Sequence, residues 1–435
     1  MSWALRFRIR QNLKGNLWVA PLLGGVIGWL LSFASRWLDG RFTLPAGYVY
    51  SAGTAQTILT TIVGAMIALT GFVVTVTVLV VQMSTQTFSA RYMRIWYRDP
   101  VLKAVLAVLL CTLFFSFALL GKVERHAVPS ISVTVAGLLV GAVLVLFLVF
   151  LDRYLHRLRP VAVAEIVGRA GREAVGAYSE AAELGEWADP PEAHESPLAG
   201  DPSAAVSCER SGAVQALNTH ALVAWATHAD RVLVMVNGIG DFLVGGTRLF
   251  DVYGGPISAA DEQRLRGLVA LGTERTIDQD PAFALRVMVD IANKALSTAI
   301  NDPTTAVQVI DRVEELLMTI GKTPGFDGSY ELRDAGGRRR VVLPAPRWDE
   351  FLSLGTTEIR QNGHSTIQVV RRLRSMLEGL REAVLLEYVP AVDRELERLD
   401  ATVNDSFGGS VDFDLAGVSD RQGIGGAPGL PTPAG

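Results

Sequence analysis

Four long apolar runs lie in the first third of the chain, at residues 17–35, within 42–90, at 104–121 and at 127–151. Each can supply the roughly 20 residues that a helix needs to cross a bilayer. Their interiors carry no Asp, Glu, Lys, Arg or His, the groups that proton-coupled carriers and pumps place at the membrane midplane. We therefore predict four transmembrane helices, and we expect neither a pump nor a proton-coupled carrier.

The second run carries a regular pattern of small and hydroxyl residues. A continuous helix from Thr54 to Met93 would be about 60 Å long, roughly twice the thickness of the hydrocarbon layer. A 3.5-residue period places the pattern on one helix face, which we call the seam. It is either a packing surface, inside the bundle or between subunits, or the hydroxyl lining of a pore built by several copies. The seam consists of Thr54, Thr57, Thr61, Gly64, Ala68, Gly71, Thr75, Gln82, Thr85 and Ser89.

Two other runs contain glycines four residues apart. These pairs are Gly24 and Gly28 in the first run and Gly137 and Gly141 in the fourth. Small residues at this spacing let helix backbones approach closely in lipid. We expect close helix packing at both pairs.

The Lys and Arg residues that flank the runs alternate in number. Four precede the first run, four lie within 91–103 and three follow the fourth run, whereas the other two loops carry two each. Basic residues gather on the cytoplasmic side, so we expect the N-terminus, the 91–103 loop and everything after residue 159 to be cytoplasmic. The first run is long for a signal peptide, and we expect an uncleaved anchor. A fifth span within 42–90 would reverse the charge pattern.

The chain after residue 151 differs in charge and in periodicity. It holds 28 basic and 41 acidic residues, against 12 and 3 before that point. Short β-rich runs with glycine turns come first, followed by helical periodicity and one hairpin. The predicted fold is a multi-span α-helical membrane protein with a C-terminal mixed α/β cytosolic domain. The predicted parts are a basic N-terminus at 1–16, a four-helix transmembrane domain at 17–159, a juxtamembrane helix and linker at 160–206, a small β-rich subdomain at 207–257, a mainly helical domain with a β-hairpin at 258–403 and a disordered tail at 404–435.

Acidic residues and Asp-Pro pairs are concentrated between residues 278 and 311. Asp is a favoured helix N-cap and Pro is favoured at the next position, so Asp280 and Asp302 are interpreted as caps of two helices. Asp290 and Lys294 are spaced for an ion pair on one helix face. The alternative is a ligand groove, in which Asp278 and Asn301 join these side chains. An enzyme would require the carboxylates to converge in a cleft.

Several chemistries are not supported by the sequence. Two cysteines, six scattered histidines and the absence of CxxC and HExxH patterns argue against a disulfide framework or a metal site. The stretch GDFLVGGTRLF looks like a turn of biotinyl and lipoyl domains, but no lysine lies between Lys122 and Lys294. A swinging-arm carrier is therefore excluded, and we expect no cofactor and no enzymatic activity.

Several segments together resemble a known family. They are TILTTIVGAMIALTGFVVTVTVLVVQMSTQTFSARYMR, RSGAVQAL, GDFLVGGTRLF, RTIDQDPAFALRVMVDIANKALSTAINDPTTAVQVIDR and EIRQNG. The chain resembles the bacterial family of predicted membrane proteins with domain of unknown function 2254. Ala90 and Thr298 stand where that family is expected to have proline, which affects local kinks only. The resemblance implies a multi-span inner-membrane protein with a cytosolic domain and assigns no activity.

Two functional hypotheses follow from these patterns. The first is a homo-oligomeric, channel-like or otherwise passive assembly in the bacterial inner (plasma) membrane, with a cytosolic regulatory domain. The alternative is a membrane-anchored sensor or interaction protein whose cytosolic domain binds a small ligand or a partner. The expected partners are the lipid bilayer, further copies of the chain and an unknown ligand or protein, and no nucleic acid.

Overall fold

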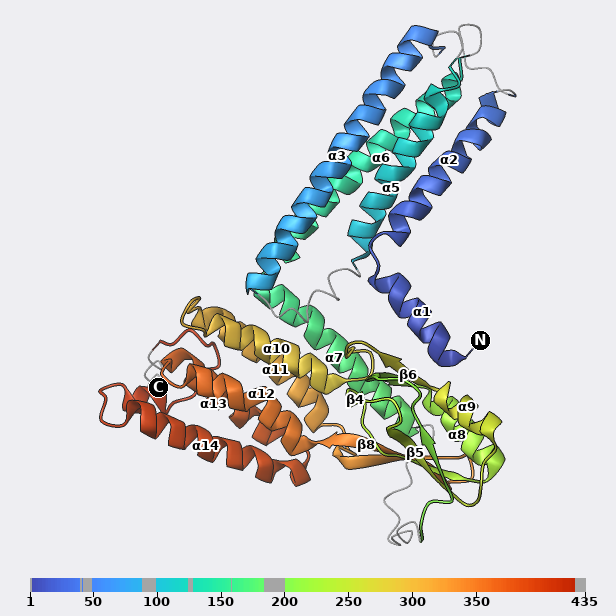
Figure 1. Cartoon of the computed structure of the whole chain (residues 1–435). Coiled ribbons are helices and arrows are strands. Elements are labelled where there is room, and N and C mark those ends of the chain that lie inside the picture. Colours follow the sequence, from blue (N-terminus) through green and yellow to red (C-terminus); the bar gives the residue numbers. More distant parts are fainter. Residues whose placement is uncertain are drawn as a thin grey trace, which may run out of the picture. The chain divides into compact units, whose positions relative to one another are not determined.

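The computed structural model describes residues 2–39, 41, 49–87, 99–123, 128–157, 159–183 and 200–426 (Figure 1). The chain forms two compact units. Gln11–Arg159 make the four-helix unit, and Met1–Arg10 together with Pro160–Gly435 make the α/β unit.

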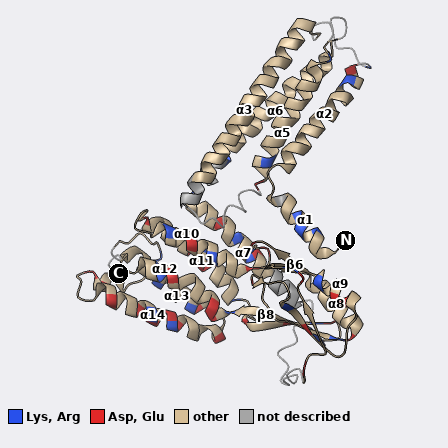
Figure 2. Ribbon diagram, in the orientation of Figure 1, with Lys and Arg blue, Asp and Glu red and all other residues tan. Residues whose placement is uncertain are grey.

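The four-helix unit contains the four predicted spans. They are α2 (Val19–Asp39), α3 (Ala52–Thr87), α5 (Pro100–Leu120) and α6 (Ser130–Arg157). All four are long and apolar enough to cross a membrane, and Figure 2 shows few charged residues along them. The prediction of four candidate membrane helices followed by a mixed α/β region is confirmed. With 36 residues, α3 is about 54 Å long.

Bare glycines bring α2 and α5 into backbone contact. A Cβ atom added to Gly24 would lie 2.1 Å from Ala107 O, and one added to Gly28 would lie 2.1 Å from Cys111 O. The close packing predicted for this pair is therefore present. The second predicted pair behaves differently, because a Cβ on Gly137 or Gly141 of α6 would meet no described atom within 4 Å.

Carboxylates cap two of these helices. Asp39, at the end of α2, accepts hydrogen bonds from the backbone N–H groups of Ile131 (2.7 Å) and Ser132 (3.2 Å) in the first turn of α6. Asp99 accepts the N–H of Val101 at 2.7 Å, and Pro100 is the first residue of α5. First-turn N–H groups have no partner within their own helix, so both side chains satisfy donors that lipid could not.

The α/β unit contains two sheets. The five-stranded sheet has the order β1 (Ala204–Ser207), β5 (Arg248–Tyr253), β3 (Val232–Met235), β8 (Arg339–Arg347) and β7 (Asp327–Arg333). The three-stranded sheet has the order β4 (Phe242–Leu243), β2 (Gly212–Leu217) and β6 (Val269–Gly272). Among the described strands, only the β3–β8 pair is parallel. Both sheets contribute buried residues to one apolar core, which includes Leu233, Phe250 and Val341.

The β-rich and helical parts of the α/β unit are not separate. Leu233 of β3 pairs with Val341 of β8, and Val234 pairs with Val342. The predicted boundary at residue 257 would divide this sheet. The structure corrects it, because the residues on both sides of the boundary belong to one sheet. The hairpin β7–β8 belongs to the sheet because its buried apolar residues complete the same core.

Helices make up the rest of the α/β unit. They are α7 (Pro160–Glu183), α8 (Thr219–Ala229), α9 (Ala259–Arg266), α10 (Pro281–Ala295), α11 (Pro303–Gly321), α12 (Trp348–Gly363), α13 (Ile367–Ala383), the 3-10 helix η3 (Leu386–Tyr388), α14 (Val389–Phe407) and α15 (Phe413–Ala416). The predicted juxtamembrane helix is α7, and it packs on α10 and α11 (Figure 1). A Cβ on Gly171 would lie 2.8 Å from Ala284 Cβ and 2.7 Å from Leu316 Cδ2. This helix is thus an integral part of the unit.

The basic N-terminus begins with a helix that docks on the α/β unit. This helix is α1 (Trp3–Gly15). Ala4 N donates a hydrogen bond to Gly267 O at 2.9 Å, and Trp3 packs against the apolar core. The segment 1–16, predicted only to be basic, therefore contains a helix whose first turn, from Trp3, docks on the α/β unit.

Residues 404–426 are ordered, which corrects the predicted disordered tail. Helix α14 continues to Phe407, and the chain beyond α15 is fixed to α13 by the buried Arg371. Its Nε donates to Val418 O at 3.0 Å, and its Nη1 donates to Gly426 O at 2.6 Å. A segment held by hydrogen bonds to its backbone carbonyls needs no apolar periodicity in its sequence. Hydrophobic periodicity therefore did not indicate that this segment is ordered. Residues 427–435, and 184–199 of the predicted linker, lie outside the described residues.

Candidate functional site

The seam lies on the outer face of α3 within the four-helix unit. The opposite, buried stripe of α3, which includes Leu59, Met66 and Val73, faces the neighbouring helices. A Cβ on Gly64 or Gly71 would meet no described atom within 4 Å. The seam is therefore not a packing surface inside this unit. Its exposed members are Thr54, Thr57, Thr61, Gly64, Ala68, Gly71, Thr75 and Gln82; the side chain of Thr85 and residue Ser89 lie outside the described part of the chain.

Three seam threonines, Thr57, Thr61 and Thr75, use their hydroxyl protons within α3. Thr57 donates to Gly53 O (2.9 Å), Thr61 to Thr57 O (2.8 Å) and Thr75 to Gly71 O (2.9 Å). A hydroxyl has one proton and two acceptor lone pairs. Each threonine therefore offers acceptor oxygen, and no further proton, to whatever contacts this face.

The sequence pattern missed part of this face. Gln56, Thr60 and Ala65 are also exposed on α3. Each lies beside a seam residue, so the face is wider than a single 3.5-residue stripe along the first half of the helix. The missed signal was the same composition of small and hydroxyl residues one position away from the repeat.

Asp280 and Asp302 are N-caps of α10 and α11. Asp280 Oδ1 accepts the N–H of Phe283 at 3.0 Å, and Asp302 Oδ1 accepts the N–H of Thr305 at 3.0 Å. Asp280 is 3% exposed, and its Oδ2 receives hydrogen bonds from Arg275 Nε (2.9 Å) and Nη2 (2.7 Å). Burial raises the pKa of Asp280, and the Arg275 guanidinium opposes that rise. Both carboxylates thus cap the N-terminal ends of helices.

The remaining residues of this stretch do not form one groove. Asp278 precedes α10 and Asn301 follows it, and both are exposed. The 15 residues of α10 hold the two ends about 22 Å apart, too far for one small ligand. Asp290 pairs with Arg286 at 2.6 Å, while its predicted pair with Lys294 stays a prediction.

A polar network joins α10 to α12. Arg286 donates to both carboxylate oxygens of Glu358, at 2.5 and 2.8 Å, and its Nε donates to Asp290 at 2.7 Å. Asn293 Nδ2 donates to Glu358 at 2.7 Å, and Asn362 Nδ2 donates to Asn293 Oδ1 at 3.1 Å. The hydrogen bonds that Arg286 donates to Glu358 raise the pKa of Arg286. Because these side chains satisfy one another, the network is a structural link between two helices.

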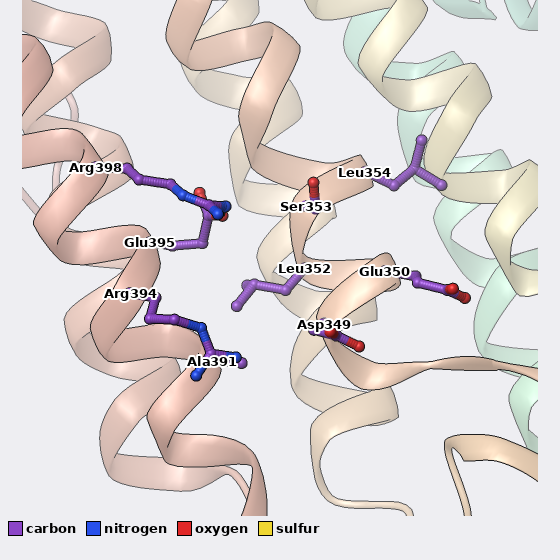
Figure 3. A pocket seen from close by; sticks show the side chains of 9 residues that line it. All are labelled: Asp349, Glu350, Leu352, Ser353, Leu354, Ala391, Arg394, Glu395 and Arg398. Carbon is purple, nitrogen blue, oxygen red and sulfur yellow. The ribbon is translucent and has the colours of Figure 1, made fainter.

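A cavity of about 510 Å³ lies between α12 and α14 (Figure 3). Figure 3 shows Arg394, Glu395 and Arg398 on α14 facing Ser353 and Asp349 on α12. Pockets for small molecules typically measure about 300–1,000 Å³ and carry a few placed polar groups. This cavity is therefore large enough for a small ligand. Its lining residues are Asp349, Glu350, Leu352, Ser353, Leu354, Ala391, Arg394, Glu395 and Arg398.

The two carboxylates of α12 in this cavity already have partners. Asp349 pairs with Arg347 at 3.1 Å, and Glu350 accepts the backbone N–H of Arg347 at 3.0 Å. Arg394, by contrast, has no ion-pair or hydrogen-bond partner among the described residues. No sequence pattern indicated this cavity, because its two walls come from separate helices whose charged residues are typical of solvated faces.

A second cavity, of about 440 Å³, lies along α8 beside the β7–β8 hairpin. Its lining includes His220, His228 and Arg333. Within the described ranges, no group of three or more His, Cys, Asp and Glu side chains could hold a metal ion.

Comparisons with known proteins agree with the membrane helices. The family model described as "Predicted membrane protein (DUF2254)" matches residues 14–379. Uncharacterized proteins of Mycobacterium tuberculosis and Mycobacterium bovis are each 27% identical over 396 residues, which cover 87% of this chain and 74% of theirs. No solved structure matches the chain significantly. Because the family model covers most of the sequence, the chain belongs to the DUF2254 family of predicted membrane proteins.

Proposed function

We propose that the protein is a homo-oligomeric, passive membrane assembly in which the seams of several α3 helices face a shared axis. The observation that carries this proposal is the outward face of α3, which combines small residues, threonine hydroxyls and two glycines with open space around them. The α/β unit then serves as the regulatory part of each subunit.

The outer faces of the neighbouring helices differ from the seam. Leu22 and Leu30 of α2 are 58% and 54% exposed, and Leu138 and Leu148 of α6 are 70% and 65% exposed. Large apolar side chains suit contact with lipid. Small and hydroxyl residues suit close contact between helices, where lipid supplies no hydrophobic drive. Beside the seam, α3 also exposes large apolar side chains such as Ile67 (58%) and Leu79 (52%). We infer that these side chains, α2 and α6 face lipid and that the seam of α3 faces other subunits.

The chemistry of the seam limits what could pass along such an axis. Thr57, Thr61 and Thr75 present acceptor oxygens because their protons bond the helix backbone. The predicted spans carry no Asp, Glu, Lys, Arg or His in their interiors, so transport would not be coupled to protons. Cations and small neutral solutes are therefore the favoured permeants.

Ion flux into liposomes tests this proposal. We expect the purified protein to conduct, and we expect Gly64→Leu and Thr75→Leu to abolish flux by filling the axis while the oligomer persists. Gly137→Leu is the matched control, since Gly137 is also exposed and open but lies on α6. Oligomers that dissociate only in the α3 variants would mean that the seam is a dry interface. The absence of flux from folded wild type would remove the channel function.

A second candidate function rests on the cavity between α12 and α14. Its volume of about 510 Å³ and its mixed charged lining favour binding of a small ligand. In this function the α/β unit is a ligand sensor anchored in the membrane.

We also propose that the protein lies in the bacterial inner membrane with both ends in the cytoplasm. The counts of basic residues beside the spans support this orientation. The hydrogen bond between Ala4 and Gly267 supports it as well, because it joins a residue before the first span to one after the fourth.

A further inference from the structure

The buried Glu395 has unused acceptor capacity in the cavity between α12 and α14. Its side chain is 3% exposed, and it forms an ion pair with Arg398. Thr356 Oγ1 lies 3.2 Å from Glu395 Oε2 and 2.7 Å from Leu352 O. Its single proton can serve only one of these two acceptors, and threonines in helices commonly bond the carbonyl four residues earlier. An ionised carboxylate offers about four acceptor positions, so Glu395 can accept further donors.

Arg394 supplies the opposite charge. It lies next to Glu395 on α14, is exposed, and has no partner among the described residues. Figure 3 shows its side chain extending from α14 toward α12. A guanidinium presents a planar set of N–H donors that matches a carboxylate. Arg394 is therefore available to bind an anionic group at the mouth of the cavity.

The two charges together restrict the ligand. Glu395 would repel a simple anion such as phosphate, and Arg394 and Arg398 would repel a simple cation. A molecule that carries an ammonium and a carboxylate satisfies both groups, since its ammonium supplies the donors that Glu395 lacks. The walls add the Ser353 hydroxyl and the apolar side chain of Leu352, and about 510 Å³ accommodates a molecule of this size.

We propose that the cavity between α12 and α14 binds a small zwitterion, with Glu395 accepting from its ammonium group and Arg394 donating to its carboxylate. This inference rests on the second proposed function, ligand binding by the α/β unit, and does not depend on what α3 does.

Direct binding to the detergent-purified full chain tests it. The probes are glycine, β-alanine and γ-aminobutyrate, three zwitterions of increasing charge separation. Propionate, ethylamine and inorganic phosphate are the single-charge probes. Calorimetry and the thermal shift of tryptophan fluorescence report binding. We expect saturable binding of at least one zwitterion, about tenfold or more tighter than any single-charge probe, because a lost charge-assisted contact costs about that factor.

Three variants locate the site. Glu395→Gln and Arg394→Gln should each weaken zwitterion binding by about tenfold or more. Glu397→Gln is the matched control, because Glu397 lies exposed on the same helix without a described partner, and it should leave binding unchanged. If Glu395→Gln impairs folding, Arg394→Gln carries the test, since removing an unpaired exposed guanidinium should not alter the fold.

The outcomes separate this inference from the function on which it rests. Zwitterion binding that depends on both residues supports it. Saturable binding of propionate, ethylamine or phosphate to the wild type that the same variants weaken, without zwitterion binding, overturns the ligand class. The sensor function then remains. Binding of no probe overturns both.

Discussion

Arg340 connects two parts of the α/β unit through a pair of aspartates. It is 7% exposed, and its Nε donates to Asp334 at 2.7 Å within the hairpin. Its Nη1 donates to Asp230 at 2.9 Å, at the left-handed end of α8. These hydrogen bonds from Arg340 lower the pKa of both Asp334 and Asp230. The arginine therefore fixes the hairpin against α8 as long as the aspartates are ionised.

Replacing Arg340 should make stability respond differently to pH. We expect Arg340→Met to lower the free energy of unfolding at pH 7 by about 1.5–3 kcal/mol, the range for a hydrogen bond to a charged group, through loss of its bond to the buried carboxylate of Asp334. The folded aspartates have lowered pKa values, so their contribution is present above the unfolded pKa of about 3.9. It is lost as the pH falls through the folded values. The difference between wild type and variant should therefore shrink in acid.

Thermal unfolding of the full chain in detergent, from about pH 7 to about pH 3, measures this difference; the range brackets the aspartate pKa. Arg338→Met is the control, because Arg338 is exposed in the same hairpin. A difference that stays constant over the whole range would contradict the role assigned to Arg340.

Single-residue roles could be predicted where the partner is close in sequence. Asp280 and Asp302 each bond an N–H three residues later, and the Asp-Pro spacing is sufficient to indicate such a cap. Arg371 bonds Val418, 47 residues away. No local pattern encodes that contact, so the ordered segment that it holds was predicted to be disordered.

Among the elements, α3 shows what periodicity can and cannot reveal. The 3.5-residue repeat predicts that the seam residues share one helix face, and those with described side chains are exposed. It could not show whether that face packs inside the unit, because small residues occur both at helix contacts and at outer faces. The cavity between α12 and α14 was missed for a related reason: Glu395 and Arg394 are adjacent in sequence but differ in burial, because α14 packs against the distant helices α12 and α13.

The two glycine pairs allow a direct comparison of helix contacts. We expect Gly28→Ala in α2 to destabilise the four-helix unit by about 1–3 kcal/mol, the usual range for overpacking, because its Cβ would lie 2.1 Å from Cys111 O. Gly137→Ala in α6 meets open space and should be tolerated. Thermal stability and monodispersity in detergent measure both variants. Equal effects of the two substitutions would show that the α2–α5 contact does not govern stability.

At the scale of the whole molecule, composition alone divided the chain correctly into a membrane-like part and a charged part. The four spans and the mixed α/β region were predicted from hydropathy and periodicity. The internal boundary at residue 257 was wrong because β3 and β8, about a hundred residues apart, lie in one sheet. Strand pairing over such a separation has no local signature in the sequence.

Membrane orientation is tested by thiol accessibility in intact cells. In a chain whose Cys111 and Cys208 are replaced by alanine, we expect Val49→Cys to react with a membrane-impermeant reagent. Ser2→Cys and Glu397→Cys should react only after lysis. All three positions are exposed, so burial does not limit the reaction. Labelling of Ser2→Cys in intact cells would contradict the cytoplasmic N-terminus. Labelling of Glu397→Cys would place the α/β unit outside the cytoplasm.

The contact between Ala4 and Gly267 can form only late in the synthesis of the protein. A ribosome synthesises Ala4 before any of the four spans and Gly267 only after all of them. Domains commonly fold as units while the chain emerges, the N-terminal one first, but here residues made before the spans belong to the unit that is completed after them. Until then, Trp3 lacks the apolar core against which it packs. The nascent chain thus exposes a basic, tryptophan-containing helix while its spans are inserted into the membrane.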